Sequence, residues 1–181
     1  MIDDKDILDI YKEGGKEEYA FNLLTRKYSE RLYWHIRKLV GSHEESNDLL
    51  QETLIKVWKY LPSFREESKL YTWLYRIATN ETLTYLKKEK LKKFLSLSSY
   101  EQQIENKIEA DPYFNGDALQ MQLQKAISKL PPKQRTIFNL RYFNEMKYED
   151  IVEILGGSVG SHKASYHHAH SKVEEYLKAM N

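Results

Sequence analysis

The sequence predicts an all-α protein made of two helical domains, and three observations lead to this prediction. Apolar residues recur at helical spacing, which indicates that one face of each helix is buried. Glycine and proline are scarce, with 7 and 4 residues among 181, so few breaks interrupt the helices. Residues 94–117 are polar and lack this periodicity, which is typical of a linker. We therefore expect one domain over residues 1–93 and a second over residues 118–181.

In the first domain, we expect helices over residues 17–40 and 46–61 and a third long helix that begins at Leu70. Gly41 and the polar residues after it supply the stop and the caps between the first two helices. Pro62 interrupts the pattern, so an ordered loop is expected before the third helix. The predicted core-facing stripe of the second helix consists of Leu50, Leu54, Val57 and Leu61.

The linker is expected to hold a short helix around residues 100–109. The pair of prolines that begins at Pro131 restarts the chain within the second domain, because proline favours the first turn of a helix. The helices predicted for this domain cover residues 118–130, 132–143, 148–155 and 159–179.

The net charge of +1 conceals a strongly uneven distribution. Residues 56–93 carry ten basic and four acidic side chains, a net charge of +6, whereas residues 94–119 carry a net charge of −4. The basic block predicts a polyanionic partner, and the alternative is a solvated helix end. Cysteine is absent, which excludes disulfides, thiol nucleophiles and thiolate metal sites. The acidic N-terminus lacks the apolar core of a signal peptide, and no apolar run is long enough for a membrane span, so we expect a cytoplasmic protein without membrane insertion.

Residues 148–179 have the pattern of a helix-turn-helix. Gly156 and Gly157 permit the positive φ angles of a sharp turn, and Ser158 can cap the second helix. Small residues near the start of that helix allow close approach to DNA, where the positive end of the helix dipole favours phosphate. The predicted inward positions are Val159, His162, Tyr166, Ala169 and Val173. We expect duplex DNA to be contacted by Ser158, Gly160, Ser161, Lys163, Ser165, His167 and His168.

Four of the six histidines lie in this last helix, which raises the question of a metal site. Helical zinc pairs are spaced four residues apart, and no two of these histidines have that spacing. His167 and His170 are three apart, with no carboxylate between them. We therefore expect no metal, cofactor or catalytic histidine, and a core position for His162. A histidine-metal enzyme is the weakest alternative.

The run "LPPKQRTIFNLRYFNEMKYEDIVEILGGSVGSHKASYHHAHSKVEEYL" resembles region 4 of the extracytoplasmic-function (ECF) sigma factors, a subgroup of the sigma-70 family. The resemblance implies that its second helix reads the −35 promoter element. Family members often have Val at the position of His162 and Arg at the position of His168. Because imidazole is mostly uncharged at neutral pH, His168 would contact phosphate more weakly than arginine.

Upstream, "DLLQETLIKVWKYLPSFREESKLYTWLYRIATNETLTYLKK" resembles region 2 of the same subgroup. On its own, the outward stripe of the second helix is either a docking patch or a solvated face, and the resemblance implies that it binds the beta-prime clamp of RNA polymerase. This docking stripe consists of Asp48, Gln51, Glu52 and Ile55.

The third helix carries Trp73, Arg76 and Asn80 at helical spacing, a set able to stack on, pair with and neutralise a single DNA strand. The alternative for Trp73 is a place in the core. The resemblance implies that the preceding loop, "SFREESK", captures a base flipped out of the −10 element. The residues expected to bind this strand are Phe64, Arg65, Ser68, Lys69, Trp73, Arg76, Asn80, Lys87 and Lys88.

These observations together predict an ECF-type sigma factor rather than an enzyme. It would bind core RNA polymerase, through the beta-prime clamp and the beta flap, and promoter DNA; an anti-sigma partner is common in the family. The chain contains no GxxxxGK[ST] nucleotide-binding motif, so binding energy alone must open the promoter. The linker would run through the polymerase near the template, or serve as a flexible spacer. The alternative is a stand-alone helix-turn-helix repressor or activator.

Overall fold

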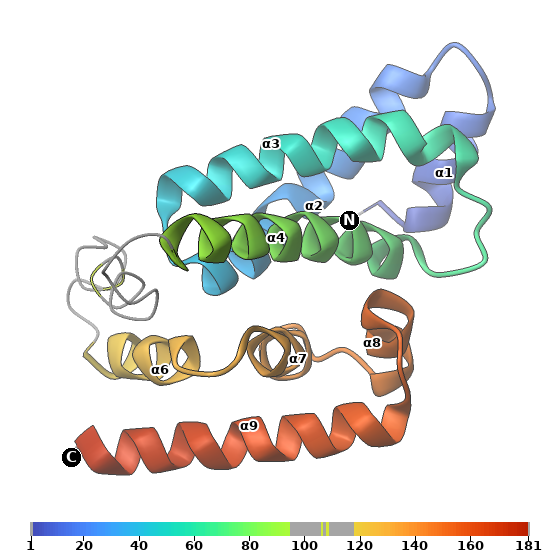
Figure 1. Ribbon diagram of the computed structural model, residues 1–181. Coiled ribbons are helices and arrows are strands. Elements are labelled where there is room, and N and C mark those ends of the chain that lie inside the picture. The colour runs from blue at the N-terminus through green and yellow to red at the C-terminus, as the bar shows by residue number, and fades with distance from the viewer. Residues whose placement is uncertain (1, 95–105, 107, 109–117, 181) are drawn as a thin grey trace.

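The structure is a computed structural model that describes residues 2–94, 106, 108 and 118–180, and every longer regular element in these residues is a helix (Figure 1). The helices lie in two layers, with α2, α3 and α4 in one and α6 to α9 in the other. The predicted linker helix around residues 100–109 and most of the linker fall outside the described residues. The helices are α1 (Asp4–Lys12), α2 (Glu17–Val40), α3 (His43–Tyr60), the 3₁₀ turn η1 (Leu61–Ser63), α4 (Leu70–Phe94), α6 (Ala118–Ser128), α7 (Pro132–Tyr142), α8 (Tyr148–Leu155) and α9 (Val159–Met180).

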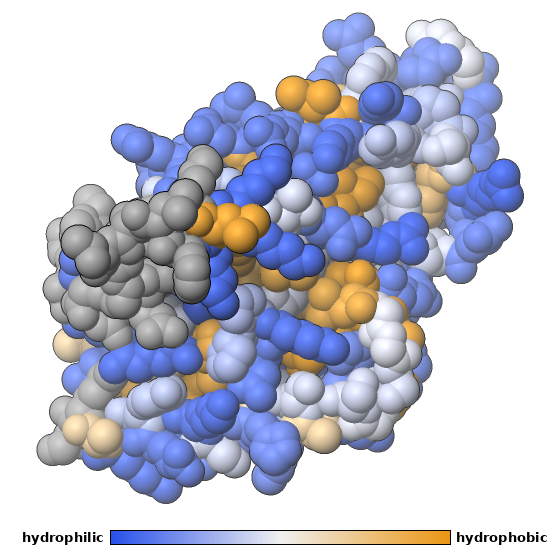
Figure 2. Space-filling model, viewed as in Figure 1, coloured by the Kyte–Doolittle hydropathy of each residue, from blue (hydrophilic) through white to orange (hydrophobic). Residues whose placement is uncertain are grey.

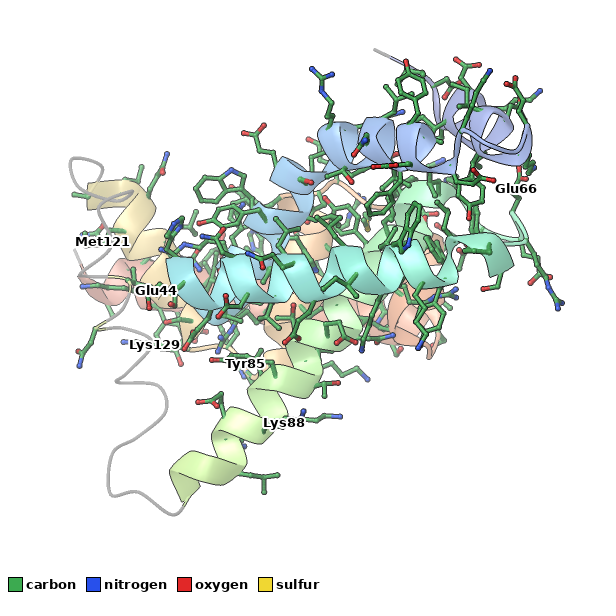
Figure 3. The ribbon with its side chains drawn as sticks, turned by 90° about the horizontal axis from the view of Figure 1, so that it is seen from above. Glu44, Glu66, Tyr85, Lys88, Met121 and Lys129 are labelled. Atoms are coloured by element: carbon green, nitrogen blue, oxygen red, sulfur yellow. The ribbon has the colours of Figure 1, made fainter. Side chains whose placement is uncertain are left out.

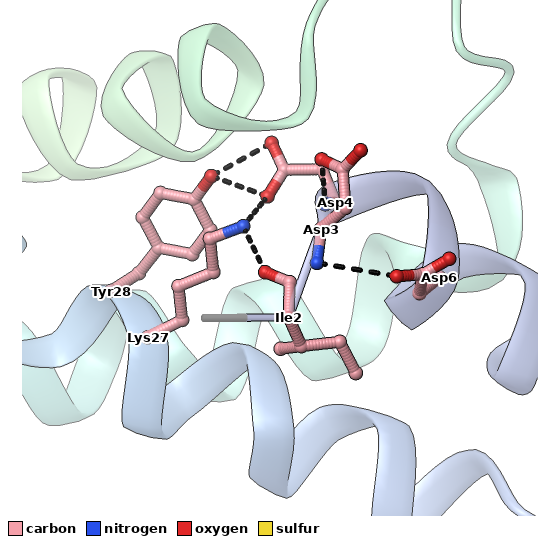
Figure 4. Close-up of polar contacts among 6 residues, drawn as sticks. All are labelled: Ile2, Asp3, Asp4, Asp6, Lys27 and Tyr28. Carbon is pink, nitrogen blue, oxygen red and sulfur yellow. Dashed lines mark hydrogen bonds and ion pairs between the residues drawn. The ribbon is translucent and has the colours of Figure 1, made fainter.

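Helix α1 was not predicted from the sequence. Asp3 caps it, and the Asp6 carboxylate accepts a hydrogen bond from the Asp3 backbone N–H in return. The Asp4 carboxylate then accepts hydrogen bonds from Tyr28 Oη at 2.7 Å and from Lys27 Nζ at 2.6 Å, both on α2 (Figure 4). These contacts hold α1 against α2 while its apolar face contributes to the core.

The predicted helices of the first domain are present, with small shifts at their ends. The predicted core-facing stripe of α3 is confirmed at Val57 and Leu61, which are buried. Further toward the start of the helix, Leu49 and Thr53 are buried, whereas the predicted Leu50 and Leu54 are half-buried beside them. Thr53 tolerates burial because its hydroxyl donates to the Leu49 carbonyl at 2.7 Å, which satisfies its polar group within the helix.

In the C-terminal layer, α9 packs along α6 and α7 and supplies Ala169 and Val173 to a second apolar cluster with Ile127 and Phe138. The turn between α8 and α9 uses positive φ angles of 71° at Gly156 and 85° at Gly157, as the sequence predicted. Both glycines therefore serve a backbone conformation that other residues adopt only with strain.

The two layers pack tightly against each other. Helix α8 lies against α4, and α7 lies against α2. Apolar side chains of the second layer, including Leu140, Met146 and Ile154, belong to the same buried cluster as Leu39 and Leu74 of the first layer. Figure 2 shows hydrophobic side chains at the junction of the layers on an otherwise mostly hydrophilic face. None of the helices within residues 2–94 and 118–180 has the length and apolarity of a membrane-spanning segment.

Candidate nucleic-acid interface

The start of α9 presents a polar, small-residue surface. Ser158 caps the helix, because its hydroxyl accepts a hydrogen bond from the Ser161 backbone N–H at 3.2 Å. Lys163 is exposed, and its Nζ lies 5.8 Å from the centre of the Tyr148 ring. Exposed backbone N–H groups and a cation at a helix N-terminus can bind phosphate. Of the predicted duplex-contacting residues, Ser165 is half-buried and the exposed ones are Ser158, Gly160, Ser161, Lys163, His167 and His168.

His162 is completely buried, which confirms its predicted core position. Its Nε2 lies 2.7 Å from the carbonyl oxygen of Gly156. Because a carbonyl can only accept, Nε2 carries the proton of this hydrogen bond. The imidazole thus connects α9 to the first residue of the turn, a contact that the sequence analysis did not predict. In addition, no cluster of three or more potential metal ligands exists among the described residues.

The exposed face of α4 carries Asn80, Lys87 and Lys88, while Arg76 is half-buried. Figure 3 shows Lys88 near the end of α4 that projects beyond the other helices. Of the two positions that the sequence left open for Trp73, the structure shows the one in the core. Trp73 is only 8% exposed, and its ring packs on Phe64 with 4.9 Å between centroids. The indole therefore supports the loop from beneath instead of facing solvent.

The loop between η1 and α4 is held at both ends. Glu66 has a φ of 56°, an unfavourable conformation for a residue other than glycine, and its carboxylate pairs with Lys12 of α1 (Figure 3 labels Glu66). Arg65 is exposed and Ser68 half-buried. At the other end, Lys69 Nζ lies 3.3 Å from the Asp150 carboxylate of α8. Contacts from two other helices thus fix a loop that carries several of the predicted strand-binding residues.

The docking stripe on α3 is exposed at all four positions, Asp48, Gln51, Glu52 and Ile55. Ile55 is 67% exposed, and Trp58, one turn further along α3, is 45% exposed with its ring edge-on to Phe21. An apolar side chain beside carboxylates is the composition of a protein-binding patch. Sequence reasoning missed Trp58, although its position three residues after Ile55 places it on the same face.

The sequence analysis also did not predict the contact between Asp150 of α8 and the start of α4. Asp150 is 5% exposed, and its carboxylate accepts hydrogen bonds from the Tyr71 hydroxyl and from Lys69. The hydrogen bond that Lys69 donates to Asp150 raises the pKa of Lys69. Burial and, to a smaller extent, the hydrogen bond that Tyr71 donates to Asp150 raise the pKa of Tyr71. No periodicity in the sequence indicates this pair, because its members are about 80 residues apart.

Comparison with known families identifies two regions of the chain. Residues 24–92 match sigma-70 region 2, and residues 120–173 match sigma-70 region 4. The fold and these two regions define a sigma-70-type transcription initiation factor, a protein that recognises DNA and is not an enzyme. The chain is 30% identical over 177 residues to the ECF RNA polymerase sigma factor SigW of Bacillus subtilis, with 93% of this chain and 94% of SigW covered. It belongs to the ECF family of RNA polymerase sigma factors, as predicted.

Further similar proteins are also sigma factors. The sigma-H factor of Pseudomonas aeruginosa is 28% identical over 98% of this chain and 95% of its own length. The solved structure of RpoE from Bartonella quintana, in complex with the anti-sigma factor NepR, is 26% identical with a TM-score of 0.73, covering 87% of this chain and 96% of RpoE. CnrH, solved with the cytosolic domain of CnrY, shares the fold at 18% identity and a TM-score of 0.73, covering 98% and 99% of the two chains.

Proposed function

We propose that the chain directs core RNA polymerase to promoters by reading the −35 element with α9 and the −10 element with α4 and the loop before it. The observation that carries this proposal is the presence, in one chain, of an exposed polar surface at the start of α9 and a separate exposed basic face on α4. A helix reads paired bases in the major groove, whereas amide and cationic side chains in line suit a single strand.

Promoter opening would use binding energy alone. Flipping a base out of the duplex costs a few kcal/mol, and stacking and pocket contacts offset about 1–3 kcal/mol per base. The loop supports this role because it is fixed before DNA binds: Lys12 pairs with Glu66, and Phe64 lies on Trp73. A loop that is already ordered loses less conformational entropy when it captures a base.

The docking stripe would bind the beta-prime clamp, and residues 118–181 would bind the beta flap. The carboxylates of the docking stripe give electrostatic complementarity to a basic partner, and Ile55 offers apolar area. A cytoplasmic location and control by an anti-sigma protein belong to the same proposal, the latter supported by the anti-sigma complex of RpoE from Bartonella quintana.

The direct test is transcription with purified components. Mixing the protein with core polymerase and a promoter library, then sequencing the transcripts, should give start sites that share one −35 and one −10 sequence. The same polymerase without this protein should give no such enrichment. If the protein binds duplex DNA alone but selects no start sites with polymerase, a stand-alone helix-turn-helix regulator replaces the proposal.

A further inference from the structure

Helix α1 lies beside the loop before α4, which we call the −10 loop and define as residues 64–69 (Figure 1, Figure 3). The helix is anchored on α2 at its first residue. The Asp4 carboxylate accepts hydrogen bonds from Lys27 Nζ at 2.6 Å and from Tyr28 Oη at 2.7 Å. The Lys27–Asp4 pair is shielded from solvent, with side chains that are 13% and 27% exposed. Contacts with α2 therefore fix the position of α1, without help from the loop.

The −10 loop and α1 also share one apolar core. Ile7 and Leu8 of α1 belong to the same buried cluster as Trp73 of α4, and Phe64 packs against this cluster. The centres of the Phe64 and Trp73 rings are 4.9 Å apart. This packing fixes the first residue of the loop, whereas residues 65–67 are exposed. Burial does not set the conformation of these exposed residues, so polar contacts must do so.

An ion pair connects the last residue of α1 to the middle of the −10 loop. Lys12 donates a hydrogen bond to the Glu66 carboxylate, and this bond raises the pKa of Lys12. Glu66 has a φ of 56°, which is uncommon for a residue with a side chain. A backbone conformation of this kind persists only where surrounding contacts hold it. The pair with Lys12 is such a contact, and it comes from α1.

The charges of the −10 loop give this pair a second effect. The loop contains two acids, Glu66 and Glu67, and two bases, Arg65 and Lys69. A carboxylate that faces DNA phosphates is repelled by them. Lys12 lies outside the loop and supplies a cation that offsets the charge of Glu66 and draws its carboxylate toward α1. Arg65, the preceding residue, stays exposed.

We propose that α1 is a positioning element of the −10 loop, in which Lys12 holds the Glu66 carboxylate toward α1 and so sets the conformation in which the loop discriminates the captured base. The proposal rests on the proposed function, since it requires that this loop captures a base of the −10 element. Lys12 is a positioning residue: it acts through Glu66 and the loop backbone, without contact to the base. Its effect is therefore on base discrimination and not on binding of core polymerase.

The test compares promoter opening on two templates that differ only at the −10 base most strongly selected from the promoter library. Full-length protein and core polymerase are used, permanganate reactivity measures opening, and the ratio of the two openings measures base discrimination. In Lys12→Glu, two carboxylates face each other. Because the side chains of Lys12 and Glu66 are 56% and 43% exposed, the ratio should fall about two- to fivefold, the range typical of exposed ion pairs.

Exchange of the two charges separates a positioning role from a general loss of structure. Glu66→Lys alone should also lower the ratio, because two cations then face each other. The double variant Lys12→Glu/Glu66→Lys restores an ion pair at the same place and should recover the wild-type ratio. Core affinity, measured by sedimentation, should be the same in all of these proteins.

Lys16→Glu is the matched control. Lys16 forms an exposed ion pair near the same end of α1, but its partner is Glu13, 2.6 Å away, instead of a residue of the loop. The same charge reversal at this position should leave base discrimination unchanged. Circular dichroism should report intact helices in every variant.

A second measurement needs neither polymerase nor DNA. The heteronuclear ¹⁵N NOE of the Arg65 and Glu67 amides reports fast motion of the loop in the free protein. It should decrease in Lys12→Glu and recover in the double variant. An unchanged ratio in Lys12→Glu, or a double variant that recovers neither the ratio nor the NOE, would overturn the proposal. A wild-type protein that selects no start sites would instead refute the proposed function, while the NOE still shows whether Lys12 orders the loop.

Discussion

His35 is a buried titratable side chain, only 1% exposed, on the inner face of α2. Its Nε2 lies 2.9 Å from Thr79 Oγ1 on α4, and its ring lies 5.1 Å from that of Tyr75. Burial and, to a smaller extent, the nearby Lys38 ammonium lower the pKa of His35 to about 3, against an opposing contribution of the Asn144 side chain. The native state therefore keeps a neutral imidazole where an unfolded chain, with a histidine pKa near 6.5, binds a proton.

This difference predicts that the protein loses stability in mild acid. Between about pH 6.5 and pH 3, the unfolded state binds the extra proton, so the free energy of unfolding falls as pH falls, by up to about 1.4 kcal/mol per pH unit. Urea unfolding at pH 7.5 and pH 5 should therefore differ by about 2 kcal/mol from this group alone. His35→Gln should flatten this slope, whereas His167→Gln, at an exposed position, should retain it. Equal slopes in wild type and His35→Gln would contradict the assignment.

Asn80 gives the residue-scale prediction for DNA. It is exposed on α4, so Asn80→Ala should leave the fold intact and remove hydrogen bonds to an unpaired base. We expect promoter opening at −10 to decrease about two- to tenfold, corresponding to a lost hydrogen bond of about 0.5–1.5 kcal/mol. Permanganate reactivity of unpaired thymines measures opening, and sedimentation measures core binding, which should not change. Asn22→Ala on α2 is the matched control, and equal loss of opening and core binding in Asn80→Ala would contradict the assignment.

Residue-scale prediction from the sequence succeeded where periodicity alone decides the environment. His162 was expected inside because it shares a stripe with Ala169 and Val173, and all three are buried. It left Trp73 undecided between surface and core, because a large aromatic residue near a loop is compatible with both exposure and burial. It could not detect Asp150, whose burial depends on a partner in the other layer.

At the scale of elements, α3 carries the prediction for polymerase binding. Asp48 and Glu52 are exposed and one turn apart, so reversing both to lysine should change the free energy of unfolding by about 0.5 kcal/mol or less. The two lysines would face the basic surface of the partner, and like charges in contact cost several kcal/mol, so the affinity for core polymerase should fall about a hundredfold or more. Titration of core polymerase with labelled protein measures this affinity. Reversing Glu149 and Glu153, an exposed pair with the same spacing on α8, is the control, and retained affinity in the α3 variant would count against this docking site.

The helices themselves were largely predictable, because their apolar periodicity and their stop signals are local. Helix α1 was missed for a physical reason. Its sequence reads as an acidic terminus, and a helix of 9 residues is marginal without tertiary contacts. Those contacts, from Tyr28 and Lys27 to Asp4, come from α2 and are invisible in the local pattern. The burial of Leu49 and Thr53 in place of Leu50 and Leu54 has a similar origin, since α3 packs against both α2 and α4 and local periodicity does not show where these neighbours lie.

At the scale of the whole molecule, the relation between the two layers could not be predicted. The sequence indicates two domains and a polar linker, a pattern equally compatible with independent units. The structure instead completes the C-terminal turn of α2 with donors from the other layer and joins apolar side chains of both layers in one cluster. Folding of one layer should therefore stabilise the other.

This coupling predicts a single unfolding transition. The three tryptophans, Trp34, Trp58 and Trp73, all precede the linker. Their fluorescence therefore reports unfolding of the first layer, whereas far-ultraviolet circular dichroism reports the helices of both layers. In the wild-type protein the two urea curves should coincide, because the shared core makes unfolding cooperative. In Asp150→Lys, a charge is left facing Lys69, so the dichroism curve should separate from the fluorescence curve and begin at lower urea. Glu149→Lys should keep the curves together, and separate curves in the wild type would mean that each layer folds without the other.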